Sequence, residues 1–136
     1  MPTEYAMGFL FDSQGQRVAL IRKNRPALIA GKLTGLGGHR EEGESFAQCI
    51  VREYFEESGV ATQLADWTHF ATVSTDYMLM SCFFSRSALV DEVLTLEDEE
   101  VCVYRIEDLA ESDMANFTAE LIRLALHYDG EVAELN

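Results

Sequence analysis

Residues 37–60 constrain this chain more than any other segment, because they crowd acidic side chains around one short predicted helix. Ser45 can cap that helix and Gly59 can end it, so we predict a helix over residues 46–58. Like charges three or four residues apart cost roughly 0.2–0.5 kcal/mol per pair on an exposed helix. Because this repulsion destabilises the helix, we expect the crowded carboxylates to have a role that offsets it. The acidic residues of the segment are Glu41, Glu42, Glu44, Glu53, Glu56 and Glu57.

Three of these carboxylates share one predicted helix face, since Glu53, Glu56 and Glu57 stand at i, i+3 and i+4. Such a patch suits a hard divalent cation: Mg²⁺, with Mn²⁺ as the alternative, prefers oxygen ligands and bridges carboxylates to substrate phosphates. The competing interpretation is a solvated acidic face stabilised by Arg52. The opposite side is predicted to anchor the helix through Phe46, Cys49, Ile50 and Tyr54.

Charge is distributed unevenly along the chain. The net charge of −14 argues against binding to a nucleic acid duplex. Residues 13–40 nevertheless contain no acid, and acids become dense again over residues 91–113. Cations beside a carboxylate cluster fit a metal-bound polyphosphate, although an uneven solvated surface explains the pattern equally well. The candidate phosphate-binding residues are Arg22, Lys23, Arg25 and Lys32.

The remaining pattern predicts a mixed α/β fold in one domain of residues 1–136. Residues 5–11 and 17–23 read as a hairpin, and residues 24–35 as a loop. Residues 67–76, 77–85 and 100–106 read as further strands, of which 77–85 is apolar on both faces and so is expected at the centre of the sheet. Residues 116–128 have helical periodicity.

The spacing around the first helix resembles the signature of the Nudix hydrolase family. That signature reads Gly, five residues, Glu, seven residues, then Arg-Glu-U-x-Glu-Glu-x-Gly-U, with U bulky and apolar. Val60 satisfies the last U, while Tyr54 fills the first, where an aliphatic residue is usual. All seven fixed positions match: Gly38, Glu44, Arg52, Glu53, Glu56, Glu57 and Gly59.

The resemblance implies an α/β/α Nudix sandwich with a mixed sheet, in which the signature forms a loop–helix–loop. It also implies Mg²⁺-dependent attack of water on a nucleoside diphosphate linked to a group X. Glu53 is the residue we favour for orienting or deprotonating that water, while Glu44 and Arg52 are expected to shape the loop–helix–loop. The implied metal ligands are Glu53, Glu56 and Glu57, a backbone carbonyl at Gly37 or Gly38, and a later carboxylate among Glu97, Asp98, Glu99 and Glu100, with Glu100 favoured.

The approach to the signature, GKLTGLGGHREEGE, resembles the MutT-like nucleoside triphosphate pyrophosphatases. The resemblance to this branch implies that the substrate is an ordinary or oxidised nucleoside triphosphate, which is cleaved to a monophosphate and pyrophosphate. Thr34 stands where that branch often has Asn, so we expect it to contact the base, and His39 is a candidate phosphate contact. Asn116 resembles an asparagine used for a purine edge, but capping of the last helix explains it as well.

Three alternatives stay open. Tyr77 stands near the sequence position where dinucleoside polyphosphate hydrolases tend to carry a tyrosine, although burial in a strand explains Tyr77 equally well. An ADP-ribose hydrolase ranks lower because the expected proline is absent, and a non-catalytic nucleotide sensor ranks lower because every glutamate of the signature is present.

The expected partner is a small nucleotide, with neither duplex nucleic acid nor membrane. No apolar run approaches the roughly 20 residues of a membrane span, and no signal-peptide pattern opens the sequence. Three cysteines, an odd number, favour a reducing cytoplasm over a disulfide framework. A monomer and a homodimer are both open, because Phe70, Tyr77, Phe83 and Phe84 fit either a core or a dimer face.

Overall fold

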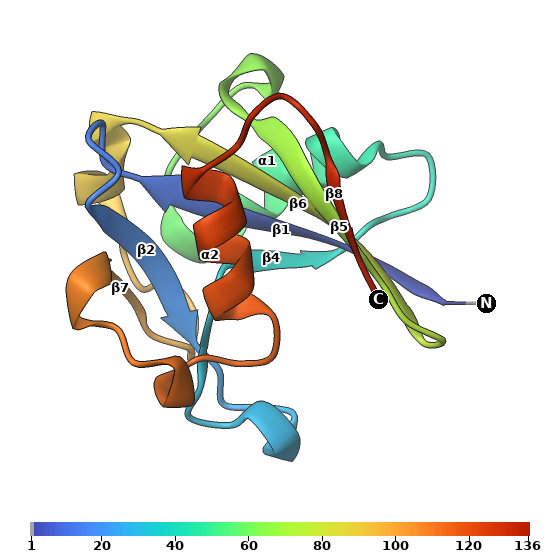
Figure 1. The fold of residues 1–136 in the computed structure, drawn as a ribbon, viewed down its shortest axis with the longest axis horizontal. Coiled ribbons are helices and arrows are strands. Elements are labelled where there is room, and N and C mark those ends of the chain that lie inside the picture. The colour runs from blue at the N-terminus through green and yellow to red at the C-terminus, as the bar shows by residue number, and fades with distance from the viewer. Residues whose placement is uncertain (1) are drawn as a thin grey trace.

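The computed structural model describes residues 2–136, which form one mixed sheet with a helix on each face (Figure 1). The helices are α1 (Phe46–Ser58) and α2 (Thr118–Leu126). The strands are β1 (Thr3–Phe11), β2 (Arg17–Arg22), β3 (Leu33–Thr34), β4 (Leu36–His39), β5 (Thr68–Ser74), β6 (Met78–Arg86), β7 (Val101–Arg105) and β8 (Ala133–Leu135).

The strand order is β3-β2-β1-β6-β5-β8, with β4 also paired to β1 and β7 also paired to β2. The predicted β1–β2 hairpin is confirmed as an antiparallel pair. β6 lies between β1 and β5, parallel to the first and antiparallel to the second. Its central position explains why its sequence is apolar on both faces, since each face is covered.

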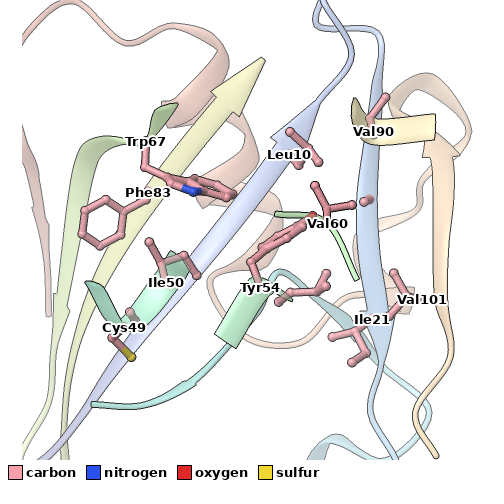
Figure 2. Close-up of a cluster of buried hydrophobic side chains, with 13 residues drawn as sticks. Leu10, Ile21, Cys49, Ile50, Tyr54, Val60, Trp67, Phe83, Val90 and Val101 are labelled. Carbon is pink, nitrogen blue, oxygen red and sulfur yellow. The ribbon is translucent and has the colours of Figure 1, made fainter. Parts of the chain in front are cut away.

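Two separate cores lie on the two faces of the sheet. Successive strand residues point to opposite faces, and β1 shows this directly. Leu10 belongs to the cluster under α1, whereas its neighbours Phe9 and Phe11 belong to the cluster under α2. Figure 2 shows the α1-side cluster, into which Ile50 and Tyr54 project from the helix. The predicted α/β/α sandwich is therefore confirmed.

The ends of α1 are set by local hydrogen bonds, as predicted. The Ser45 side chain accepts from the Gln48 N–H at 3.0 Å, and the Gln48 side chain accepts from the Ser45 N–H at 2.8 Å. This capping box satisfies two backbone donors that the helix leaves free. Gly59 ends the helix at φ 77°, in the left-handed region that glycine adopts without strain.

α2 begins later than predicted. Phe117 precedes it at φ 71°, and Asn116 lies one residue further back in the turn. The side chain of Asn116 therefore does not cap the helix, and that alternative explanation of Asn116 was wrong.

Three short strands were missed by sequence reasoning. β3 and β4 lie in or beside the predicted loop, and β8 follows the last helix. β4 approaches β1 closely: a Cβ at Gly37 would stand 1.9 Å from the carbonyl oxygen of Ala6. Only glycine fits there, so the glycines expected to approach a ligand also allow one strand to pair with another.

Candidate active site

Arg52 organises the loop–helix–loop from the side of α1. Its Nε and one terminal nitrogen donate to the two carboxylate oxygens of Glu44 at 2.7 and 2.9 Å, a bidentate pair. The same terminal nitrogen donates to the His39 carbonyl at 3.0 Å. The paired guanidinium holds the pKa of Glu44 at about 2, so this carboxylate is ionised at neutral pH. These contacts join the loop before α1 to the helix, as a shaping role for Glu44 and Arg52 requires.

The three helix glutamates differ sharply in exposure. The side chain of Glu56 is 51% exposed, that of Glu53 is 17% exposed, and Glu57 is buried. Glu57 is buried because it stands three residues after Tyr54, on the side of α1 that enters the core. The predicted patch therefore runs from the surface into the protein.

Burial perturbs the two inner carboxylates. It raises the pKa of Glu53 above its ordinary value, against the opposing effect of a 2.9 Å hydrogen bond from Arg52. It raises the pKa of Glu57 to about 8, and the neighbouring charge of Glu53 adds to this effect. The Gly37 N–H donates to the Glu57 carboxylate at 2.8 Å, and this hydrogen bond acts in the other direction and lowers the pKa. Perturbed carboxylates in a cavity are characteristic of functional sites.

Gly38 lies directly against the inner carboxylates. A Cβ at this position would stand 2.5 Å from the carboxyl carbon of Glu53. The backbone of β4 therefore reaches the Glu53 carboxylate only because residue 38 has no side chain. The Gly38 carbonyl accepts a weak contact from the Cys49 thiol at 3.6 Å.

A cavity of about 580 Å³ joins this helix face to the sheet. Glu53 and Glu57 line it, whereas Glu44, Arg52 and Glu56 do not. Its wall includes residues of both cores, so it reaches past the glycine-rich β4 from the α1 side toward the α2 side. The lining residues that the sequence predicted are Lys23, Arg25, Thr34, Gly38, His39, Glu53 and Glu57.

The four predicted phosphate-binding cations are divided by the structure. Lys23 and Arg25 line the cavity, and acidic residues of the loop before β7 hold them. Lys23 pairs with Glu99 at 2.9 Å, and Arg25 pairs with Asp98 at 2.9 Å.

Arg22 and Lys32 lie outside the cavity. Arg22 donates to the Gly31 carbonyl at 2.8 Å, and Lys32 donates to the Ser112 carbonyl. Both side chains hydrogen-bond to loop backbone, and the structure does not bring them to the predicted phosphate site.

The predicted substrate contacts are likewise divided. Thr34 and His39 line the cavity, but the Thr34 hydroxyl donates to the Gly35 carbonyl at 2.6 Å. Asn116 lies elsewhere, in a separate hollow of about 210 Å³. Tyr77 is 83% exposed in the turn before β6, so its explanation as a buried strand residue was wrong.

The later carboxylate favoured from sequence, Glu100, lies outside the cavity. Glu100 is exposed, does not line the cavity, and acts electrostatically on Cys102 and Tyr104 of β7. The charge of Glu97 instead contributes to the raised pKa values of both Glu53 and Glu57. Glu97, one of the four acids considered from the sequence, thus acts electrostatically on the helix glutamates, although it does not line the cavity either.

The donor set suits a hard cation in its chemistry. Glu53 and Glu57 are inner carboxylates that repel each other, and a cation between protein and phosphate would relieve that repulsion. Within residues 2–136, however, no three acidic, histidine or cysteine side chains already converge as a metal cluster. Glu53 and Glu56 are turned toward Arg52, at 2.9 and 3.3 Å. The residue types fit a metal, and binding requires these side chains to reorient.

Sequence reasoning missed the apolar wall of the cavity. Tyr5 and Met7 of β1, Met78 and Met80 of β6, and Ile29 line it. The strand pairing Tyr5↔Met80 brings two of them side by side. Nothing in the local sequence distinguishes the four strand residues from ordinary core residues, because the parallel pairing of β1 and β6 brings them to one wall.

The structure brings carboxylates of one helix and two cations to a single cavity of small-molecule size. The sequence model of the NUDIX domain matches residues 1–125, and the chain therefore belongs to the Nudix family. With every glutamate of the signature present, it is a Nudix pyrophosphohydrolase.

Solved structures agree with this fold. The chain is similar to a MutT Nudix hydrolase from Burkholderia pseudomallei, with a TM-score of 0.76 and 19% identity over 91% of this chain and 98% of that one. It is similar to a MutT protein from Bacillus halodurans, with a TM-score of 0.70 and 18% identity over 96% and 86%. A MutT/nudix family protein from Enterococcus faecalis gives a TM-score of 0.76 and 16% identity over 96% of this chain, which spans 65% of that protein. No curated protein sequence matches the chain.

Among residues 2–136, no helix combines the length and the apolar character needed to cross a membrane.

Proposed function

We propose that this chain hydrolyses an ordinary or oxidised nucleoside triphosphate to a nucleoside monophosphate and pyrophosphate in the presence of Mg²⁺. One observation carries the proposal: a single cavity is lined by the inner carboxylates Glu53 and Glu57 and by the cations Lys23 and Arg25. Its volume of about 580 Å³ falls within the range of small-molecule sites, roughly 300–1,000 Å³. Two proteins of similar fold are named MutT, one of them as a MutT Nudix hydrolase, and this agrees with the proposed reaction class.

The proposed metal ligands are Glu53, Glu56, Glu57 and the Gly38 carbonyl, with Glu97 now favoured over Glu100 as the later carboxylate. Bound Mg²⁺, or Mn²⁺ in its place, would supply Lewis acidity and lower the pKa of a coordinated water.

The side chains of the chain itself supply three further functions. Glu53, whose pKa is raised by burial, accepts the proton of the attacking water. Lys23 and Arg25 neutralise the outer phosphates, and they exchange their ion pairs with Glu99 and Asp98 to do so. His39 lies at the cavity wall, where it can donate to a phosphate oxygen.

Dinucleoside polyphosphates are the second candidate, because Tyr77 is free to stack on a base. It is 83% exposed and directly precedes Met78, which lines the cavity. ADP-ribose hydrolysis and nucleotide sensing without turnover have no comparable observation in their favour. We also propose a cytoplasmic protein, since all three cysteines are free thiols. A monomer and a homodimer remain to be distinguished by sedimentation.

The test is product analysis on a panel of nucleoside triphosphates, 8-oxo-dGTP, a dinucleoside tetraphosphate and ADP-ribose, with Mg²⁺ and with chelator. We expect Mg²⁺-dependent release of pyrophosphate and monophosphate from triphosphates. Glu53→Gln and Glu56→Gln should each lower kcat at least about a hundredfold. Glu120→Gln, an exposed change on α2, is the matched control and should retain full turnover. Full activity of the Glu53 and Glu56 variants, or cleavage of the dinucleotide alone, would refute the assignment.

A further inference from the structure

The cavity contains a large apolar region with few groups that can read a base edge. Its apolar residues come from β1, from β6 and from the loop after β2. They are Tyr5, Ala6, Met7, Ile21, Pro26, Ile29, Met78 and Met80. Among residues 2–136, no Asn, Gln, Asp or Ser lines the cavity. The two-point donor and acceptor pattern with which an amide recognises a purine edge is therefore absent.

The polar groups that remain are poorly suited to base discrimination. The Thr34 hydroxyl uses its only donor on the Gly35 carbonyl, so it offers a base only an acceptor. His39 and Tyr5 lie with their ring centroids 4.5 Å apart and tilted by 44°. Tyr5, held against His39, thus offers an aromatic face on which any base can stack.

Methionine is concentrated at this site. Met7, Met78 and Met80 are three of the five methionines in the chain. Methionine is unbranched and polarizable, so it adapts to ligands of different outline and is common at promiscuous binding surfaces. Met7 and Met78 are only partly buried, whereas Met80 is buried.

From these observations we propose that the cavity holds the base of its nucleotide by stacking and apolar contact, without side-chain reading of the base edge. The enzyme is then a broad-specificity nucleoside polyphosphate hydrolase, and Tyr5, Met7, Met78 and Met80 set its preference through the size of the base. This inference rests on the proposed function. Apolar pockets separate ligands by roughly 10–200-fold, whereas sites that hydrogen-bond a polar edge separate them by about 10⁴-fold or more.

The test compares substrates that differ only at the base edge with substrates that differ in size. We expect kcat/KM for dATP, dGTP and dITP to agree within about tenfold, because these purines stack alike. The pyrimidines dCTP and dTTP should fall below the purines by roughly 10–200-fold. A difference above about a thousandfold between dGTP and dITP would overturn the proposal.

Single substitutions distinguish recognition of the base by the apolar wall from recognition by a side chain that hydrogen-bonds the base edge. Tyr5→Ala and Met78→Ala change partly buried residues and should raise KM for every purine by a similar factor, at least about fivefold, with kcat nearly unchanged. Leu64→Ala, an exposed apolar change outside the cavity, is the control and should match the wild type on all five triphosphates. Asn116→Ala should also leave the purine ratios unchanged, and loss of a preference in that variant would assign base reading to Asn116 instead.

Binding measurements test this inference separately from the proposed function. Calorimetric titration with α,β-methylene analogues of the same five nucleotides requires no hydrolysis. Similar Kd values for the purines without turnover of any triphosphate would refute the proposed function and support the apolar site. Selective binding of one purine would refute the apolar site even if hydrolysis is observed.

Discussion

Replacement of Glu57 by glutamine should stabilise the metal-free protein while it removes a proposed metal ligand. Glu57 is buried, and its environment raises its pKa from 4.5 to about 8. In the unfolded chain at pH 7 this carboxyl is ionised, so folding must take up a proton or bury a charge. Glutamine requires neither, and its side-chain oxygen can still accept the hydrogen bond from the Gly37 N–H.

The magnitude follows from the two pKa values. At pH 7 the carboxyl is about 2.5 pH units above its unfolded pKa, and each unit corresponds to about 1.4 kcal/mol. Glu57→Gln should therefore raise the free energy of unfolding by about 3 kcal/mol as an upper figure. For a chain of this size that is a rise in Tm on the order of 10 °C.

The pH dependence has a definite sign. A carboxyl whose pKa is raised by folding contributes its full stability below pH 4.5, and that contribution is lost as the pH rises toward about 8. The advantage of Glu57→Gln over the wild type should thus be small near pH 5 and largest near pH 8.

Urea unfolding in chelator at pH 5, 7 and 8 measures this difference. Glu56→Gln makes the same chemical change one position earlier, on a half-exposed side chain, and should alter stability by no more than about 0.5 kcal/mol. Added Mg²⁺ should stabilise the wild type more than Glu57→Gln. If Glu57→Gln is less stable than the wild type in chelator at pH 8, the reasoning about burial is wrong.

Three further changes test other parts of the site. Tyr54→Phe should stabilise the protein by about 1 kcal/mol in thermal unfolding, because the Tyr54 hydroxyl is buried without a hydrogen-bond partner among residues 2–136; a loss of stability would reveal a partner. Gly38→Ala should lower kcat at least about tenfold with little change in Tm, since its Cβ displaces the Glu53 carboxylate; unchanged turnover would contradict this. Glu44→Gln should cost about 2 kcal/mol at pH 7 by removing the bidentate pair with Arg52. Because the pKa of Glu44 is lowered to about 2, its contribution is present above pH 4.5 and is lost as the pH falls toward 2, so urea unfolding should show a smaller difference near pH 3.

Sequence reasoning succeeded where a signal is local. Ser45, Gln48 and Gly59 set the ends of α1 through contacts within a few residues, and both ends were predicted correctly. The hairpin and the buried centre of the sheet followed from turn residues and from apolar runs. The fixed spacing of the signature identified the family in the same way.

Sequence reasoning failed where a residue depends on a distant segment. β3 and β4 are too short to show periodicity and exist because β2 and β1 pair with them. The three helix glutamates look equivalent on a helical wheel, yet only Glu56 stays half exposed once α1 rests on the sheet. Glu97 and Glu100 are of the same residue type in one loop, and only the path of that loop separates them.

By itself, therefore, the sequence determined the helix, its carboxylates, the family and the general chemistry, because each is encoded by residues near one another in the chain. The tertiary structure alone decided which cations reach the cavity and what surrounds the substrate. Lys23 lines the cavity and Arg22 does not, although they are neighbours in sequence. Tyr5 and Met80 lie side by side at one wall only because β1 and β6 pair in parallel, a contact that no local pattern can specify.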